Sequence, residues 1–203
     1  MNLPKEITDL ISKYNLVEIT DFHVSGDKVY NIGNKFILKV SNDVNRLSDE
    51  WMKDLWFSKY LFNIKPIKFI ILDDVAYYLR EYIDGCNLCD ERYLSNPILL
   101  IKLLREALEI LDSIPKEDCP FIVGDGNAII HGDFCLPNIL VSKDKVVGFI
   151  DLSCAGIGDK WCDYAWCIWS LEYNLKTNEF TPLLLKELGI EFDIEKFNKY
   201  TKD

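Results

Sequence analysis

The features that would place this chain in a membrane or on a nucleic acid are missing from its sequence. Among its 203 residues there is no run of 18 or more apolar side chains, so no transmembrane helix is expected. Residues 1–11 form an amphipathic opening that contains acidic side chains, unlike a signal peptide. Lysine and arginine total 23 against 33 aspartates and glutamates, and the net charge of −10 would repel the phosphates of a nucleic acid.

Cysteine is present, but in no pattern that indicates disulfide bonds or a metal. The seven cysteines are an odd number without the spacing of a secreted scaffold, so we expect a reducing compartment, the cytoplasm. Cys86 and Cys89 have the spacing of a redox or zinc pair. No second cysteine or histidine pair follows at the distance of a zinc site, and free thiols are therefore the favoured interpretation.

What the sequence does contain is typical of a globular protein. Hydrophobic residues make up 49% and charged residues 28%, and the chain is long enough to bury a core as one domain or as two small lobes. No internal repeat or low-complexity segment is visible. The acidic balance fits a cationic substrate, but an acidic surface that serves only solubility fits it equally well.

The most informative segment is the ten-residue run from His131 to Leu140. Asp133 follows a His-Gly pair, and Asn138 lies five positions later at the start of an apolar run. Kinase-type enzymes use this layout to place one carboxylate against a hydroxyl and oxygen ligands against magnesium. An ordinary strand-to-loop turn is the alternative, but the order of the whole motif favours phosphoryl transfer.

A hairpin is expected between the two predicted magnesium ligands, Asn138 and Asp151. Strand-like runs at 138–142 and 145–150 flank a polar turn, so folding about this turn brings Asn138 and Asp151 to the same end. Two oxygen ligands suit Mg²⁺, which keeps the rest of its coordination shell for water and phosphate. Asp133, on the loop just before, would accept a proton from an attacking hydroxyl or orient that hydroxyl.

The N-terminal half predicts a small antiparallel sheet with one long helix. The expected strands are 28–32 and 35–40, around Gly33-Asn34, and 68–72 and 75–83. The expected helix is 46–62, with Ser48 as N-cap and with Leu47, Trp51, Leu55 and Ser58 on one side. Asp84-Gly85 then breaks the pattern. This order of elements is that of the N-lobe of a kinase-like fold, with a hinge near residues 82–85.

Two charged residues of this half are candidates for binding phosphate. Lys39 lies at the end of a predicted strand, where it would neutralise the α- and β-phosphates, and Glu50 on the following helix would orient it. Each alone is more often a surface charge, but the downstream motif favours a functional pair. The loop that would cover the phosphates has a single glycine, Gly26, so Ser25 and the neighbouring backbone amides are the candidates there.

The C-terminal half is predicted to be mainly helical. Residues 97–113 repeat leucine in helical phase, with Pro97 in the first turn. Residues 159–175 are apolar nearly all round, so this helix is expected inside the lobe. An aspartate within it, Asp163, needs a partner there, and the backbone of the loop around Asp133 is the useful candidate; a surface aspartate is the alternative.

These motifs resemble the aminoglycoside phosphotransferase family, in particular its 3′-phosphotransferase branch. The match covers nearly the whole chain in order, and its most specific segments are residues 131–141, 148–152 and 159–165. The resemblance implies an α+β, bilobal, protein-kinase-like fold. Residues 1–84 would form a small N-lobe built on an antiparallel sheet, and residues 85–203 a mainly helical C-lobe.

The resemblance also implies a cofactor, a metal and a role for each candidate residue. ATP would bind in the cleft with its adenine at the backbone of Tyr82 and Ile83, and the phosphoryl acceptor would be a hydroxyl of a small cationic molecule. The implied roles are Asp133 as catalytic aspartate, Asn138 and Asp151 as Mg²⁺ ligands, Lys39 and Glu50 as the phosphate pair, Ser25 beside the phosphates, and His131 and Asp163 as supports of the catalytic loop.

Several departures from the family leave the acceptor open. Family members carry a helical insertion of several dozen residues that walls the drug site, yet only ten residues separate Pro120 from His131. A C-terminal acidic-aromatic segment has no counterpart before Asp203, Cys154 replaces a usual arginine, and Ile37 stands at the adenine-stacking position. Drug resistance therefore does not follow. Two alternative functions remain: a catalytically impaired nucleotide-binding homologue, and a kinase of an endogenous amino-alcohol or sugar. The nucleotide could be GTP in place of ATP, and the sequence does not reveal the oligomeric state.

Overall fold

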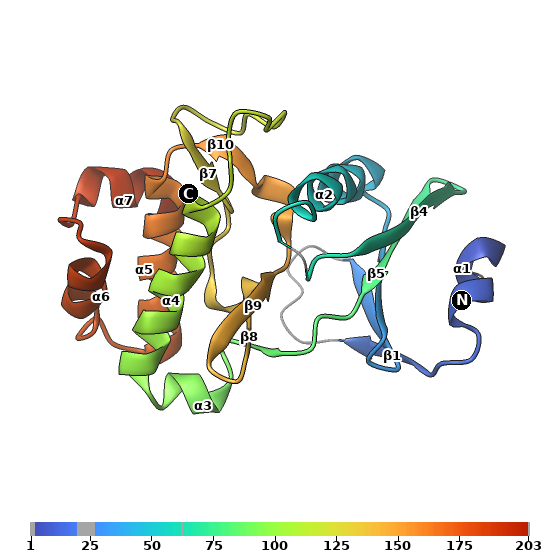
Figure 1. Cartoon of the computed structure of the whole chain (residues 1–203), viewed down its shortest axis with the longest axis horizontal. Coiled ribbons are helices and arrows are strands. Elements are labelled where there is room, and N and C mark those ends of the chain that lie inside the picture. The colour runs from blue at the N-terminus through green and yellow to red at the C-terminus, as the bar shows by residue number, and fades with distance from the viewer. Residues whose placement is uncertain (1–2, 20–26, 62, 203) are drawn as a thin grey trace. The chain divides into compact units, whose positions relative to one another are not determined.

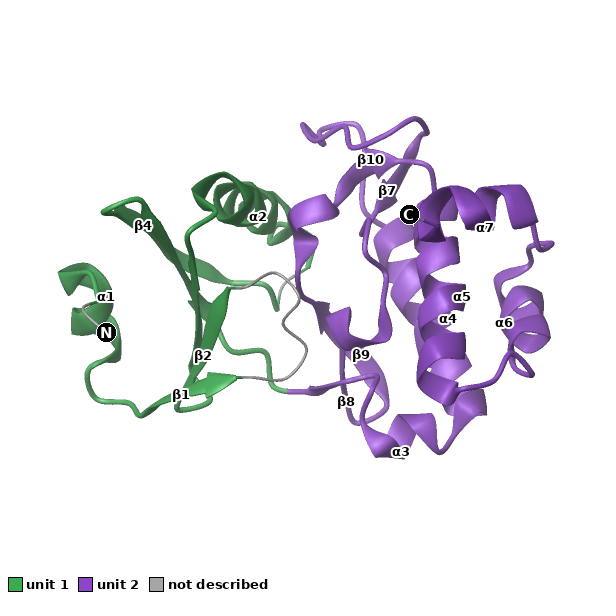
Figure 2. Ribbon diagram, turned by 180° about the vertical axis from the view of Figure 1, so that it is seen from behind, with its two compact units in different colours: residues 1–84 green, residues 85–203 purple. Residues whose placement is uncertain are grey.

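The chain divides into two compact units, Met1–Asp84 (unit 1) and Gly85–Asp203 (unit 2), which Figure 2 colours separately. The computed structural model describes residues 3–19, 27–61 and 63–202. Within these ranges no helix has the length and apolar character needed to cross a bilayer. Most of the elements are labelled in Figure 1.

In its described residues, unit 1 is an antiparallel sheet with two helices. Its described strands form one five-stranded sheet in the order β1-β2-β3-β5-β4. The elements are α1 (Lys5–Ile11), β1 (Leu16–Ile19), β2 (Lys28–Ile32), β3 (Phe36–Ser41), α2 (Val44–Phe57), β4 (Pro66–Leu72) and β5 (Val75–Glu81). The predicted β2–β3 hairpin is confirmed. Its turn residues Gly33 and Asn34 have φ of 59° and 52°, the left-handed values that a tight hairpin turn requires.

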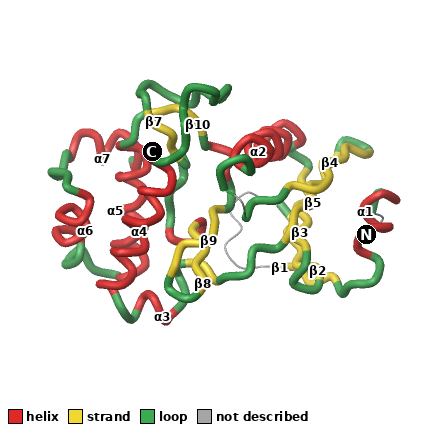
Figure 3. The backbone as a smooth tube through the Cα atoms, in the orientation of Figure 1, coloured by secondary structure: helices red, strands yellow, loops and turns green. Residues whose placement is uncertain are grey.

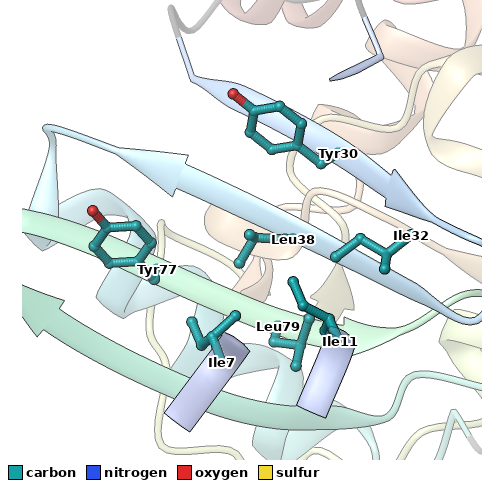
Figure 4. Close-up of a cluster of buried hydrophobic side chains, with 7 residues drawn as sticks. All are labelled: Ile7, Ile11, Tyr30, Ile32, Leu38, Tyr77 and Leu79. Carbon is teal, nitrogen blue, oxygen red and sulfur yellow. The ribbon is translucent and has the colours of Figure 1, made fainter. Parts of the chain in front are cut away.

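The two faces of this sheet bury different side chains. Because successive strand residues point to opposite faces, Tyr77 and Leu79 of β5 pack on one side with α1, while Ala76 and Tyr78 pack on the other with α2. Figure 4 shows the first cluster, in which two isoleucines of α1 meet the apolar side chains of β2, β3 and β5. The face toward α2 carries Lys39 and Tyr78, whose polar groups contact side chains of that helix.

The predicted limits and orientation of α2 were partly wrong. The helix begins at Val44 because the side chain of Asp43, rather than that of Ser48, accepts a hydrogen bond from the Arg46 amide, at 3.0 Å. It ends at Phe57. Leu55 is 37% exposed, while the charged residues Glu50, Lys53 and Asp54 are buried. Hydrophobic periodicity misplaced the buried face because polar partners on the sheet make charged side chains tolerable there.

Unit 2 is mainly helical, as Figure 3 shows, and its described strands form one two-stranded and one three-stranded sheet. Its helices are α3 (Glu91–Leu94), α4 (Pro97–Asp112), α5 (Trp161–Leu175), α6 (Thr181–Leu188) and α7 (Ile194–Thr201), with single 3₁₀ turns η1 (Leu136–Asn138) and η2 (Leu152–Cys154). Helix α4 starts as the sequence predicts: Asn96 caps it by accepting from the Leu99 amide, and Pro97 occupies the first turn.

The strands of unit 2 position the motif of residues 131–140 at their ends. In the described chain, β7 (Ala128–Ile130) pairs with β10 (Gly156–Gly158), and β6 (Cys86–Asn87), β8 (Ile139–Ser142) and β9 (Lys145–Phe149) form a second small sheet. The predicted hairpin is confirmed. Ile139 lies opposite Phe149, and the Ile150 amide donates to the Asn138 carbonyl at 3.0 Å. The start of β8 and the end of β9 therefore lie side by side.

Candidate active site

The loop that follows β7 makes a turn that only glycine fits. Gly132 has φ of 81°, and a Cβ atom there would lie 2.3 Å from the carbonyl oxygen of Cys154. This close approach brings the segment after β9 against the segment after β7. The residue that precedes the loop's carboxylate is therefore a glycine for steric reasons.

Asp133 and Asn138 lie together on this loop. The Asn138 side-chain amide donates both to the Asp133 carboxylate Oδ2, at 2.9 Å, and to the Asp133 carbonyl, at 3.0 Å. Asn138 is buried and Asp133 is half-buried. Because the amide nitrogen of Asn138 is used in this way, its amide oxygen remains as the group that can face a metal ion.

Asp151 lies where β9 ends, in an unusual backbone conformation. Its φ and ψ are 60° and 51°, the left-handed region, which costs a residue other than glycine about 1 kcal/mol or more. Both Asp133 and Asp151 act on the His131 imidazole electrostatically, so the two carboxylates share one neighbourhood. The structure thus brings together the three residues of unit 2 that the sequence assigned to catalysis and metal binding.

His131 is fully buried behind the loop. Its Nε2 lies 3.0 Å from the Ile150 carbonyl, and its Nδ1 accepts from the Asp133 amide at 3.3 Å. These partners fix the tautomer with the proton on Nε2. Burial lowers the pKa of His131, while Asp133 and Asp151 oppose this effect. A neutral imidazole in this place links the two strand ends that carry the carboxylates.

Asp163 of α5 holds the backbone of the same loop. Its two carboxylate oxygens accept from the amides of His131 and Gly132, each at 2.8 Å, and the residue is 1% exposed. Burial raises the pKa of Asp163 to about 7, while the two amide hydrogen bonds act in the opposite direction. One side chain therefore fixes two consecutive peptide groups just before Asp133.

A serine on the same helix supports the loop farther along, and sequence reasoning missed it. Ser170 is 1% exposed, and its hydroxyl accepts from the Leu136 amide at 2.9 Å. Asn174, one turn later, donates to the Ser170 carbonyl at 2.7 Å. A lone serine in an apolar helix is the signal that could have indicated this contact, since it too needs a partner when buried.

The donor set at the hairpin end fits magnesium. In the part of the chain that the structure describes, no group of three or more His, Cys, Asp or Glu side chains is arranged to hold a metal. Asn138 and Asp151 supply an amide oxygen and a carboxylate, which are hard ligands in the small number that Mg²⁺ takes from proteins. A zinc or other soft-metal site is not what these groups favour.

In unit 1 the two predicted phosphate-binding residues form a buried ion pair. The Lys39 Nζ lies 2.6 Å from Glu50 Oε1, and the two residues are 7% and 1% exposed. Arg46, one turn before Glu50 on α2, lies 3.9 Å from its other carboxylate oxygen. The alternative that Lys39 and Glu50 are two separate surface charges is thereby excluded.

The remaining candidates of unit 1 are placed only in part. The Tyr82 amide donates to the Lys35 carbonyl at 2.9 Å, so Tyr82 would offer its own carbonyl, rather than its amide, to a ligand. Ile83 is buried. A pocket of about 580 Å³ adjoins Tyr82 and is lined also by Lys35, Phe36 and Glu81, among others. Ser25 lies outside the described residues.

Comparison with known proteins identifies the class. A family model described as the phosphotransferase enzyme family matches residues 71–196, more than half of the chain. The chain belongs to this family, and it is a phosphotransferase.

The individual relatives that it resembles share one name. The chain is 27% identical to an aminoglycoside 3′-phosphotransferase of Enterococcus faecalis over 98% of this chain and 96% of that protein. It is equally similar, 27% over the same shares, to the Staphylococcus aureus enzyme of that name. Among solved structures, an aminoglycoside phosphotransferase of Streptomyces rimosus superposes with a TM-score of 0.77 at 17% identity, covering 96% of this chain and 93% of that one.

The comparisons confirm the predicted α+β, protein-kinase-like fold and show one difference in length. The alignment with the Enterococcus faecalis protein runs over 259 positions. This chain has 203 residues, so at least 56 positions of that alignment, 259 less 203, have no counterpart here. The relatives therefore contain segments that this chain lacks.

Proposed function

We propose that this enzyme transfers the γ-phosphoryl group of ATP, with Mg²⁺, to a hydroxyl of a small cationic molecule of the aminoglycoside kind. The observation that carries the proposal is the loop around Asp133, in which a half-buried carboxylate, an amide-oxygen ligand and a second carboxylate converge. Support comes also from the relatives, which are named aminoglycoside 3′-phosphotransferases, and from a solved Streptomyces rimosus structure that contains ADP and streptomycin.

Each residue of the site would have a separate task. Asp133 would receive the proton of the acceptor hydroxyl or orient that hydroxyl toward the phosphorus. Asn138 holds Asp133 by its amide nitrogen, which fixes the carboxylate that faces the acceptor. Asn138 and Asp151 would hold Mg²⁺, which when bound neutralises charge on the nucleotide phosphates.

The supports of the loop have a clear chemical purpose. Phosphoryl transfer gains most of its rate from positioning and from charge stabilisation. The carboxylate that meets the attacking hydroxyl must therefore be held within tenths of an ångström. Asp163 accepts from two backbone amides of this loop, and His131 links the Asp133 amide of the loop to the Ile150 carbonyl after β9. In unit 1, the Lys39–Glu50 pair would bind the α- and β-phosphates, and the Tyr82–Ile83 backbone would receive the adenine.

The alignment positions that this chain lacks affect which molecule accepts the phosphoryl group. If the absent segments include a wall of the drug site, another amino-alcohol or a sugar becomes the better acceptor. The net charge of −10 supports a cationic one. All seven cysteines are free thiols, which supports a reducing compartment, and we place the enzyme in the cytoplasm.

The test is ADP release with Mg²⁺ across a panel of aminoglycosides, amino-alcohols and sugars, coupled to an enzymatic readout. Asp133→Asn keeps the hydrogen bond to Asn138 but removes the proton acceptor, and we expect turnover to fall about 100-fold or more with nucleotide binding retained. The matched control is Asp144→Asn, which alters an exposed aspartate in the hairpin turn and should leave turnover unchanged. Equal turnover in Asp133→Asn and the control would refute the assignment.

A further inference from the structure

A second polar bridge joins the sheet of unit 1 to α2, beside the Lys39–Glu50 pair. The Tyr78 hydroxyl donates to Asp54 Oδ2 at 2.5 Å. Tyr78 is fully buried and Asp54 is 4% exposed. Buried side chains of this kind are costly to place, so a bridge that serves only cohesion would be more simply made of apolar groups.

The two bridges form a regular arrangement. Lys39 and Tyr78 lie directly opposite each other in the β3–β5 ladder, so their side chains leave the same face of the sheet. Glu50 and Asp54 are four positions apart on α2 and therefore share one face of the helix. Each sheet residue contacts one helix carboxylate, and the two contacts lie about one helical turn, roughly 5 Å, apart.

Packing holds the Tyr78 end of this arrangement in place. The Tyr78 ring meets the edge of Trp51 on α2, with ring centroids 5.3 Å apart. Trp51 in turn stacks on Phe69 of β4, with centroids 5.9 Å apart. The hydroxyl that meets Asp54 is thus carried by a ring that cannot turn without disturbing three elements.

The charges that face Asp54 come from α2 and from two strands. Glu50 is on its own helix, where Lys53 is also buried; Lys39 is on β3, and Arg80 and Tyr78 are on β5. From β4, the neighbour on this face is the Phe69 ring. The pKa of Asp54 is raised to about 7, chiefly by burial and also by Glu50, while Tyr78, Arg80 and Lys39 act in the opposite direction.

We infer that Asp54 is a positioning residue for the phosphate-binding lysine, an inference that rests on the proposed function. Through Tyr78 it holds α2 in the position at which Glu50 meets Lys39, and it does so without using Lys39 itself. Glu50 therefore stays in place when Lys39 turns part of its charge toward a phosphate.

The charge state of Asp54 then sets how strongly Lys39 attracts phosphate. With Asp54 neutral, Glu50 is the ionised carboxylate of α2 that contacts Lys39. With Asp54 ionised, a second negative charge lies about one helical turn away and offsets part of the positive potential of Lys39. Affinity for a nucleotide should accordingly fall as the pH rises through neutrality, by about three- to tenfold for a unit charge at this range.

The experiment measures the dissociation constant of Mg·ADP by isothermal titration calorimetry between about pH 6 and pH 8.5, a range that spans the transition. The variants are Asp54→Asn, which stays neutral yet still accepts from Tyr78, and Tyr78→Phe, which removes the donor. The matched control is Asp49→Asn, since Asp49 is an exposed aspartate next to Glu50 on the same helix.

We expect wild type and Asp49→Asn to lose affinity with rising pH, and Asp54→Asn to keep the low-pH affinity throughout. Tyr78→Phe should move the transition to higher pH, because the Tyr78 hydrogen bond favours the ionised form of Asp54. If Asp54→Asn does not fold, as circular dichroism would show, the Tyr78→Phe shift decides the matter. Identical pH profiles in wild type and the variants would overturn the inference and leave the proposed function standing. Absence of Mg·ADP binding by wild type would overturn both.

Discussion

Asp163 holds the backbone of the loop around Asp133 in place. Replacing Asp163 by alanine tests how much this contact contributes to the stability of the protein. The carboxylate accepts from the amides of His131 and Gly132 at 2.8 Å each and is 1% exposed. Asp163→Ala leaves both N–H groups without an acceptor at a site that bulk water does not reach. The loop must then either bury two unsatisfied donors or move.

The cost follows from these two donors. Each buried donor that loses its acceptor costs about 1–3 kcal/mol, so the pair costs about 2–6 kcal/mol. Removal of a buried carboxylate relieves some desolvation, since burial is what raises the pKa of Asp163. We therefore expect the free energy of unfolding to fall by about 3 kcal/mol, toward the lower part of that range.

The assay is equilibrium denaturation in urea, followed by circular dichroism at neutral pH. The matched control is Asp112→Ala, because Asp112 is an exposed aspartate whose contact with Lys160 lies at the surface. A surface pair contributes about 1 kcal/mol or less, so this variant should stay close to wild type. If Asp163→Ala and Asp112→Ala unfold within about 0.5 kcal/mol of each other, Asp163 does not hold the loop as described.

Two further predictions follow from the geometry. Gly132→Ala should lose about 2 kcal/mol or more of stability, together with turnover, because its Cβ would meet the Cys154 carbonyl. The control is Gly124→Ala, whose Cβ would have no heavy atom within 4 Å, and it should resemble wild type in the same denaturation assay. Asp54, whose pKa rises to about 7 on folding, binds a proton between about pH 4 and 7 that the unfolded chain has released. The free energy of unfolding should therefore fall with rising pH across this window, on the order of 4 kcal/mol for Asp54 alone. In Asp54→Asn it should fall less steeply. Equal slopes of unfolding free energy against pH in wild type and Asp54→Asn would contradict the raised pKa of Asp54.

The parts of the site that could be predicted from sequence are those encoded by neighbouring residues. The hairpin between Asn138 and Asp151 needs only two short apolar runs and a polar turn, although a register shift between Leu140 and Val141 is not visible in the sequence. The β2–β3 hairpin is similar, because Gly33-Asn34 accepts the left-handed conformation that a tight turn requires. Local chemistry was sufficient in both places.

The parts that sequence reasoning missed depend on residues distant along the chain. Asp54 and Tyr78 are 24 positions apart, and Leu136 and Ser170 are 34 apart. No hydrophobic periodicity links such pairs. From the sequence alone, an aspartate in a helix is therefore predicted to lie at the surface, because its buried partner is not known. Asp163 was the exception, because the helix around it is so apolar that a surface position conflicted with its neighbours.

The same contrast separates the chemistry of this enzyme from its working conditions. The local motif places Asp133, Asn138 and Asp151 together, and in the proposed function these three residues carry out the phosphoryl transfer. The pH at which unit 1 would bind nucleotide depends instead on Asp54, whose proton is governed by residues of two strands and its own helix. A relative with an apolar residue at this helix position would keep the Lys39–Glu50 contact and the reaction. It would lose the pH dependence, because no second carboxylate would oppose the charge of the lysine.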